Sequence, residues 1–345
     1  MNILYLGHYR ENTTLGHSSK RFISGLSLNK NYNLTIKPIY IHQNNTQSNN
    51  PHMELEKKTF PNYDCVIQHT LPVMLSYNKN FGKNIAVVDL HTLNINHSNY
   101  MDYLNLMDKV YVRSNYSHKA LEDLNTETSI IHEPFDVLNS QEKKSKGTYK
   151  FLAYGNLESR YNIKKIIRAF IAEFDKENDV QLILNIPDDN TKISNLLNNI
   201  NNQLRANHSI ENKIIVFNNT LTQKQEQELF STVDCAINLD KADSNGEFTL
   251  KNLCYKNLII TQANSASCDF IDSRSGFIVD SFLTNVDFLD SYDNSIHTVY
   301  EEWYDVDIDS VKNTMREAFL SNDNKQNNIN TQKFSYQHFN ETIKL

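Results

Sequence analysis

The segment from Val233 to Val279 constrains the fold of this chain more than any other. It contains, in order, an apolar strand, a polar loop with one glycine, an amphipathic helix and two further apolar strands: Cys235–Leu239, Asp240–Glu247, Phe248–Lys256, Leu258–Thr261 and Gly276–Val279. This order places a helix N-terminus beyond the carboxyl end of a parallel strand, where it can hold an anion. The segment therefore predicts either a phosphate-bearing ligand or an ordinary βαβ crossover without one.

Strands and helices alternate through the rest of the chain as well. The first half has predicted strands at Ile3–Leu6, Leu34–Tyr40, Cys65–Gln68, Ile85–Leu90 and Val110–Arg113, and helices at Ser18–Leu26 and Asn115–Leu124. The second half has predicted strands at Phe151–Tyr154, Val180–Ile186 and Lys213–Phe217, and helices at Asn162–Phe174, Ile193–Leu204 and Gln223–Phe230. This alternation indicates an α/β protein with two Rossmann-like, doubly wound parallel sheets that face each other across a cleft.

The polar segment Leu138–Tyr149 lacks any periodic pattern and is the predicted linker. We therefore expect an N-terminal domain over residues 1–140, a C-terminal domain over 148–320 and a helical tail over 321–345. Further helices are expected at Ser295–Trp303, at Asp309–Phe319 with Asp309 as its N-cap, and at Phe334–Ile343. Pro38 predicts that the strand Leu34–Tyr40 is either an edge strand or a shorter one, because proline cannot donate a ladder hydrogen bond.

Composition narrows the possible functions. A formal net charge of −7 disfavours a nucleic-acid partner, which requires a basic surface. The four cysteines have neither zinc-ligand nor C-x-x-C spacing and are expected to be reduced thiols. The sequence shows no signal peptide and no apolar run approaching the roughly 18 residues of a membrane span, which favours a cytoplasmic protein without an integral membrane segment.

Several motifs are missing or are better explained by structure. There is no Walker P-loop, no G-x-G-x-x-G and no G-x-S-x-G, which disfavours kinases, dehydrogenases and serine hydrolases. The run Asp305–Asp309 (D-V-D-I-D) imitates a metal-binding D-x-D motif. Its place after the last predicted strand, between two helices, favours helix capping, so we predict no metal site.

Two stretches of the second half resemble a known family. Phe151–Phe174 (F-L-A-Y-G-N-L-E-S-R-Y-N-I-K-K-I-I-R-A-F-I-A-E-F) is similar to an opening strand, turn and helix, and Asp243–Lys256 (D-S-N-G-E-F-T-L-K-N-L-C-Y-K) aligns without gaps with E-x-F-G-x-P-x-x-E-A-M-A-x-G. These are features of the family 4-like glycosyltransferases of GT-B fold (glycosyl transferases group 1). Tyr5–Leu26 and Asp64–Ser114 fit the first half of that fold.

The resemblance implies a glycosyltransferase that moves a sugar from a nucleotide-diphosphate donor to an acceptor, with retention of configuration and without a metal or other cofactor. The acceptor stays open among a glycan, a lipid, a protein and a nucleobase. A catalytically degenerate glycosyltransferase-like binding or scaffold protein is the alternative, and an epimerase or phosphorylase on the same fold is a third reading.

The site predictions follow from this alignment. Asp243 takes the position that holds the donor-sugar hydroxyls, and we assign it and His91 as catalytic. Lys251 stands where the family has a ribose-binding glutamate, and a lysine cannot accept a hydrogen bond. Asn156 and Tyr161 replace the usual pyrophosphate-binding Arg and Lys. Either other basic residues bind the pyrophosphate from a different part of the site, or the donor site has been lost. The predicted donor-binding residues are Arg160, Lys165, Asn218, Gly246, Glu247, Phe248, Thr249, Lys251 and Asn252.

In the first half, His91 ends the predicted strand Ile85–Leu90 and is expected to point into the crevice at the sheet's carboxyl edge. Many family members have a histidine there that touches the donor sugar. The alternative for His91, one of twelve histidines, is a side chain satisfied by loop backbone. Ser18 and Ser19 are expected to cap the first helix. A second set surrounds the first glycine loop and is expected either to orient an acceptor or to cap that helix: His8, Arg10, Gly16 and His17.

Overall fold

The computed structural model describes residues 1–345 except 42–50, 136–146, 206–212, 273, 288–296 and 322–333. The described chain forms two compact units, which we treat separately. Unit 1 comprises Met1–Val137 and Asn330–Leu345, and unit 2 comprises Leu138–Ile329. The predicted linker lies mostly outside the described residues. The last described helix belongs to unit 1, so the described residues 334–345 pack with the N-terminal unit.

Unit 1 is built on a six-stranded parallel sheet. Its strands are β1 (Asn2–Gly7), β2 (Asn33–Pro38), β3 (Cys65–His69), β4 (Lys83–Val88), β5 (Lys109–Val112) and β6 (Glu127–Ile130). Their order is β2-β1-β3-β4-β5-β6, which confirms β2 as an edge strand. The order reverses between β1 and β3, and this is the point at which open α/β sheets bind ligands.

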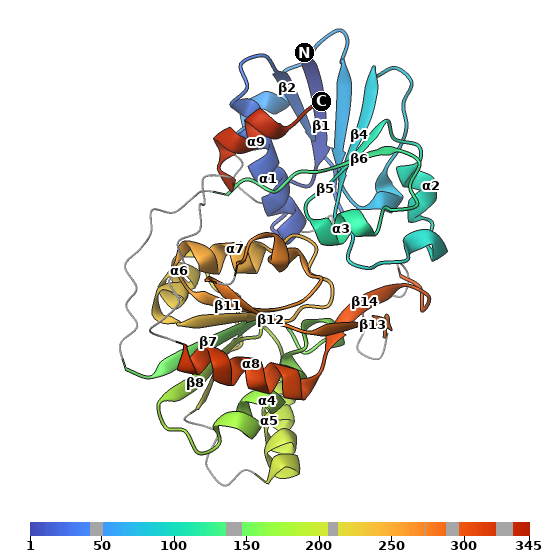
Figure 1. The fold of residues 1–345 in the computed structure, drawn as a ribbon. Helices are drawn as coiled ribbons and strands as arrows, with labels where there is room; N and C mark the ends of the chain where they lie inside the picture. Colours follow the sequence, from blue (N-terminus) through green and yellow to red (C-terminus); the bar gives the residue numbers. More distant parts are fainter. Residues whose placement is uncertain (42–50, 136–146, 206–212, 273, 288–296, 322–333) are drawn as a thin grey trace. The chain divides into compact units, whose positions relative to one another are not determined.

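The helices of unit 1 are α1 (Thr14–Ser27), α2 (Tyr100–Leu104), α3 (Asn115–Lys119) and α9 (Tyr336–Thr342). Helix α9 packs on α1, with the Phe339 ring 5.0 Å from that of Phe22 (Figure 1). Ser114 caps α3, with its side-chain oxygen accepting from the Ser117 amide. The prediction that Ser18 and Ser19 cap the first helix was wrong, because Thr13 caps α1 and both serines are buried within it.

Unit 2 contains a second six-stranded parallel sheet. Its strands are β7 (Tyr149–Tyr154), β8 (Val180–Asn185), β9 (Ile214–Phe217), β10 (Cys235–Asn238), β11 (Leu258–Gln262) and β12 (Gly276–Val279). Read from β9, the order β9-β8-β7-β10-β11-β12 is the 3-2-1-4-5-6 order of the Rossmann fold. The predicted α/β architecture of two parallel sheets is thus confirmed.

Helices cover both faces of the second sheet. One face packs against α4 (Ile163–Phe174), α5 (Asn190–Leu204) and α8 (Ile308–Leu320), with Phe151 and Phe170 in its core. The other face carries α6 (Gln223–Thr232) and α7 (Glu247–Cys254), with Leu152 and Phe230 in its core. Figure 1 shows α8 beside α4. Alternate residues of β7 therefore serve two cores, as expected for a strand buried on both faces.

One expected helix was wrong. Within Ser295–Trp303, the described residues 297–301 are not helical, and Trp303 lies in a strand, β14 (Glu302–Val306). Strand β14 pairs antiparallel with β13 (Ser281–Asn285). Asp307, not Asp309, caps the following helix α8. Asp305 of the D-V-D-I-D run is a strand residue, so capping accounts for only part of that motif.

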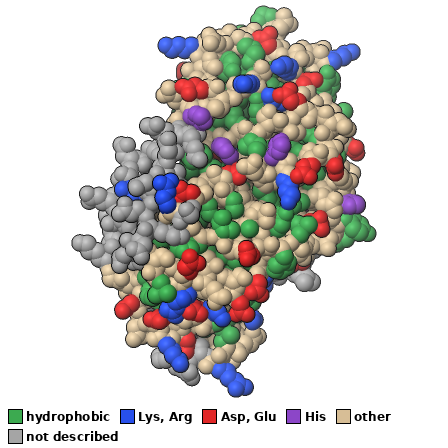
Figure 2. All heavy atoms as spheres, in the orientation of Figure 1, with side chains coloured by type: hydrophobic (Ala, Val, Ile, Leu, Met, Phe, Trp, Pro, Cys, Tyr) green, Lys and Arg blue, Asp and Glu red, His purple; other side chains and the backbone are tan. Residues whose placement is uncertain are grey.

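The described surface carries both signs of charge. On the face shown in Figure 2, acidic and basic side chains are interspersed. No described helix is long and apolar enough to cross a membrane. The described residues also contain no group of three or more His, Cys, Asp and Glu side chains that could hold a metal ion.

Candidate functional site

The order of the second sheet reverses between β7 and β10, so the loops after these two strands flank the expected ligand position of unit 2. Residues 155–162 follow β7 and residues 239–246 follow β10. Asn162 is the N-cap residue of α4 and has a left-handed backbone (φ 56°), and its side-chain amide donates to the Leu239 carbonyl at 3.0 Å. One loop is therefore tied to the other at this point of the sheet.

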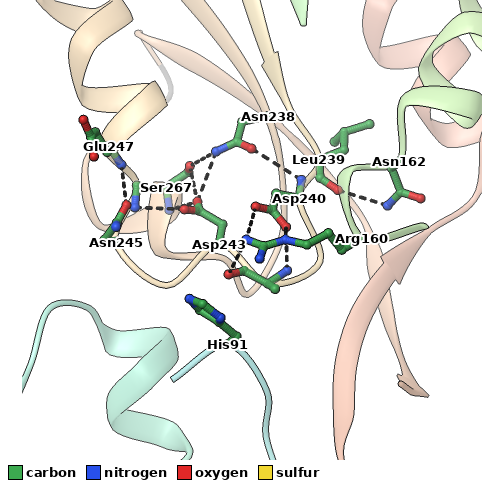
Figure 3. Close-up of polar contacts among 12 residues, drawn as sticks. His91, Arg160, Asn162, Asn238, Leu239, Asp240, Asp243, Asn245, Glu247 and Ser267 are labelled. Carbon is green, nitrogen blue, oxygen red and sulfur yellow. Dashed lines mark hydrogen bonds and ion pairs between the residues drawn. The ribbon is translucent and has the colours of Figure 1, made fainter. Parts of the chain in front are cut away.

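Arg160 makes a second link between the two loops. Its guanidinium donates to both carboxylate oxygens of Asp240, at 3.1 Å and 2.8 Å, and lies 4.8 Å from the ring centroid of Tyr161. A planar guanidinium matches a carboxylate in this two-bonded geometry. Arg160, predicted to bind the donor, thus lies on the loop after β7, where its charge is matched by Asp240 (Figure 3).

Asp243 is buried and forms the centre of the loop after β10. Its Oδ1 accepts from the Gly246 amide at 2.9 Å. Its Oδ2 accepts from the Ser267 hydroxyl at 2.6 Å, the Ser267 amide at 3.1 Å and the Asn238 side chain at 3.1 Å (Figure 3). Burial and the nearby Asp240 raise the pKa of Asp243, although these hydrogen bonds oppose the rise. Both carboxylate oxygens are engaged within the unit, so the geometry gives Asp243 a loop-ordering role.

Helix α7 begins at this loop with a glycine in the left-handed region. Gly246 has φ 64°, and a Cβ there would lie 2.3 Å from the Phe270 ring. Asn245 accepts from the Glu247 amide at 2.9 Å. The amides of Gly246 and Glu247, two predicted donor-binding residues, therefore donate to side chains of their own loop. Among the described residues, no side chain caps the following amides of Phe248 and Thr249, and Thr249 is fully buried.

Lys251 lies one turn further along α7, between two carboxylates. Its Nζ is 3.2 Å from Glu226 of α6 and 3.1 Å from Glu247. Burial opposes its charge, but the two carboxylates outweigh burial and raise the pKa of Lys251. The lysine that replaces the family's glutamate is therefore charged and held between two acids.

The other predicted donor residues fall into different settings. Asn252 is buried, and its side chain bonds Phe248 and Asn257, so it shapes the end of α7. The Thr249 hydroxyl is 2.6 Å from that of Ser267. The Phe248 ring stacks on Tyr154, with centroids 5.8 Å apart. Asn218 is exposed in the loop after β9, an outer strand away from the order reversal.

A buried cation that the sequence did not reveal lies beside these loops. The Lys241 side chain is 4% exposed, with its Nζ 3.2 Å from Asp305 and 3.6 Å from Asp287. It also donates to Ser159 at 3.0 Å and lies 5.0 Å from the Trp303 ring. Lys165, a predicted donor residue, bonds the other oxygen of Asp305 at 2.6 Å. These contacts attach β14 to the rest of unit 2.

This attachment predicts a pH-dependent loss of stability in Asp305→Asn. Burial opposes the charge of Asp305, but Lys165 and Lys241 outweigh burial and lower its pKa. The ionised Asp305 therefore stabilises the fold fully at any pH above the carboxyl pKa of the unfolded chain. This stabilisation is lost as the pH falls through the lower pKa that Asp305 has in the folded protein. We expect a loss of about 1–3 kcal/mol at pH 7, since the pair is partly solvated. Urea unfolding should show the difference shrinking below about pH 4, with the exposed Asp309→Asn as a matched control.

In unit 1, the loops after β1 and β3 flank the order reversal, and buried side chains join them. His8 is fully buried, with Nδ1 3.1 Å from Glu11 and Nε2 2.8 Å from the Thr70 hydroxyl. Glu11 also accepts from the Ile41 amide at 2.9 Å. His8, predicted either to orient an acceptor or to cap the first helix, therefore connects the two loops from the interior.

The other residues of the first glycine loop also have local contacts. Arg10 forms an ion pair with Glu56, and the exposed His17 is 3.0 Å from the Asn12 side-chain oxygen. A Cβ at Gly16 would lie 2.2 Å from the Glu11 carbonyl, so glycine is required for α1 to approach the loop. Of this set, Arg10 and His17 are the residues with side chains at the surface.

His91 lies three residues beyond the end of β4, on the loop at the sheet's carboxyl edge. The sequence predicted a longer strand that ended directly before it. The His91 carbonyl accepts a hydrogen bond from the Tyr116 hydroxyl at 2.8 Å. The sequence missed the neighbouring ionic cluster, in which Arg113 pairs with Asp89 and Glu133 while Arg21 also pairs with Glu133. An arginine at the end of a predicted buried strand, Val110–Arg113, was the available signal.

Comparison with known proteins identifies the fold. No family model and no curated protein sequence matches the chain. Anabaena HepE, solved with UDP and glucose, is similar at a TM-score of 0.59 and 12% identity over 99% of this chain and 97% of HepE. OtsA, solved in its apo form, gives a TM-score of 0.60 and 9% identity over the same shares of the two chains.

TarM of S. aureus, solved as a point mutant with fondaparinux, alpha-GlcNAc-glycerol and UDP, gives a TM-score of 0.55 and 12% identity. That match covers 80% of this chain and 54% of TarM, so this chain spans about half of TarM's length. These identities are low, and the likeness lies in the two parallel sheets and their helices. The chain thus has the GT-B fold that nucleotide-sugar glycosyltransferases share.

Proposed function

We propose that this chain is a glycosyltransferase that transfers a sugar from a nucleotide-diphosphate donor to an acceptor, with retention of configuration and without a metal. One observation carries the proposal: the fold matches over 99% of the chain to HepE, a protein solved with UDP and glucose. The loops after β7 and β10, with α7 behind them, support it as a place for the diphosphate.

In this proposal, unit 2 holds the donor. The Phe248 and Thr249 amides and the positive end of the α7 dipole stabilise the phosphates. The bond between the anomeric carbon and the phosphate oxygen breaks as the acceptor oxygen bonds that carbon from the same face. The acceptor proton passes to the leaving phosphate. Asp243 orders the loop that presents these amides, and His91 of unit 1 lines the reacting centre.

The charges of unit 2 support a second candidate, a binding or scaffold protein without activity. Arg160, Lys165 and Lys251 each contact a carboxylate, so a diphosphate must compete with Asp240, Asp305, Glu226 and Glu247. An active enzyme exchanges at least one of these carboxylates for phosphate when the donor binds. A scaffold protein keeps them as they are.

Thermal unfolding with nucleotides separates the two candidates. We expect UDP, GDP or ADP, alone or as a sugar conjugate, to raise the melting temperature by a few degrees at 100 times its Kd, where binding adds about 2.7 kcal/mol. The matching nucleoside, which lacks phosphates, should produce a smaller shift. A well-folded protein that responds to none of these nucleotides would favour the scaffold candidate instead.

A further inference from the structure

The loop that carries His91 is held by the segment that follows the neighbouring strand. Residues 89–91 follow β4, and residues 113–117 follow β5, which pairs with β4 in parallel. The contacts fall on three consecutive loop residues. Asp89 pairs with the Arg113 guanidinium, the Leu90 carbonyl accepts from the Ser117 hydroxyl at 3.2 Å, and the His91 carbonyl accepts from the Tyr116 hydroxyl at 2.8 Å.

Arg113 is itself fixed in place. Its side chain is 1% exposed, and besides Asp89 it bonds Glu133 and, at 2.7 Å, the Ser18 hydroxyl of α1. Arg21 of α1 pairs with the same Glu133. Two guanidinium groups thus face two carboxylates, so the cluster has no net charge. If Asp89 moved away, the buried Arg113 guanidinium would lose one of its two carboxylate partners, which is costly. The ion pair therefore strongly favours one position of Asp89.

The hydrogen bonds to the Leu90 and His91 carbonyls add a constraint that the Asp89–Arg113 ion pair alone does not provide. A buried pair at Asp89 would be enough to keep the loop on the sheet. Bonds to the Leu90 and His91 carbonyls also fix the orientation of the peptide planes on both sides of the His91 Cα. The direction in which the His91 side chain leaves the backbone is thereby set, as a preorganised site requires.

We infer that Arg113, Tyr116 and Ser117 are positioning residues for His91. The inference rests on the proposed function, in which His91 lines the reacting centre. In this role the three residues act through His91. Tyr116 provides the sharpest test, because Tyr116→Phe removes one oxygen and leaves the buried ring.

A matched control exists in the same unit. Tyr111 is also a buried tyrosine whose hydroxyl donates to a backbone carbonyl, that of Lys344. We expect Tyr116→Phe to shift the His91 ring signals in NMR spectra, with His91→Gln used for assignment. We also expect about fivefold faster amide exchange over residues 90–92. Tyr111→Phe should leave both unchanged.

An unchanged His91 signal and unchanged exchange in Tyr116→Phe would overturn the inference. Equal changes in both variants would overturn it too, since they would reflect general loosening of unit 1. Neither readout needs a substrate, so both decide the inference even if no nucleotide sugar is turned over. Where turnover of a UDP-sugar is detected, Tyr116→Phe should lower kcat several-fold with little change in donor KM, and an unchanged kcat would contradict the positioning role.

Discussion

Asp243→Ala should lower the free energy of unfolding by about 3–5 kcal/mol and remove any response to nucleotides. The Gly246 amide, the Ser267 amide and hydroxyl, and the Asn238 side chain all donate to this carboxylate. Without it, these four donors lose an acceptor in a buried setting, and the loop before α7 loses its order. Chemical denaturation of both proteins measures the first effect and thermal unfolding with UDP the second.

The exposed residue Asp280 supplies the matched control, because Asp280→Ala makes the same chemical change outside the loop. We expect its stability and its nucleotide response to equal those of the unchanged protein. The family alignment alone predicts a different result for Asp243→Ala, namely lost transfer with the fold intact. An Asp243→Ala protein of unchanged stability would therefore return Asp243 to the role of a direct sugar ligand.

The pH dependence of Asp243 gives an independent readout. Burial and Asp240 raise its pKa, so the folded state holds this proton more tightly than the unfolded state. Stability from this group is then highest below the ordinary carboxyl pKa and falls as the pH rises through the raised value. Asp243→Asn lacks this titration, so its stability should fall less over that interval.

The sequence predicted those parts of the fold that depend on local patterns. Apolar runs marked β10, β11 and β12, and one glycine in a polar loop marked the start of α7. The β13–β14 hairpin could not be predicted in this way. Its strands pair residues about 20 positions apart, and Phe282 and Leu283 of β13 are exposed, which obscures the alternation of a half-buried strand.

The sequence also did not show which carboxylates the basic side chains of unit 2 would contact. The sequence placed Lys251 at helical spacing from one carboxylate, Glu247, but its second, Glu226, lies 25 residues away along the chain. For Arg160 and Lys165, also placed near the loops of unit 2, the carboxylates lie 80 and 140 residues away. Local spacing carries no information on such pairs. Lys241 escaped notice for the same reason, since only the folded unit brings it to Asp287, Asp305 and Trp303.

Gly246→Ala should cost about 3 kcal/mol and weaken nucleotide binding, because it combines two effects. The backbone at Gly246 has φ 64°, which a residue with a Cβ adopts at a cost. The added Cβ would also lie 2.3 Å from the Phe270 ring, so the ring or the start of α7 must shift. A shift of α7 moves the Phe248 and Thr249 amides that we propose hold the phosphates.

Gly147→Ala separates these two effects. Gly147 also has a positive φ, 95°, but no atom lies within 4 Å of the position that an added Cβ would take, so the substitution adds backbone strain without a clash. We expect a loss of about 1 kcal/mol there and an unchanged nucleotide response. Urea unfolding and thermal shifts with UDP on both variants make the comparison. If Gly246→Ala and Gly147→Ala each lose only about 1 kcal/mol of stability and each keep the nucleotide response, the contact between Gly246 and Phe270 does not set the position of α7. A Gly246→Ala protein that is destabilised as expected yet binds nucleotide normally would place the phosphates away from the start of α7.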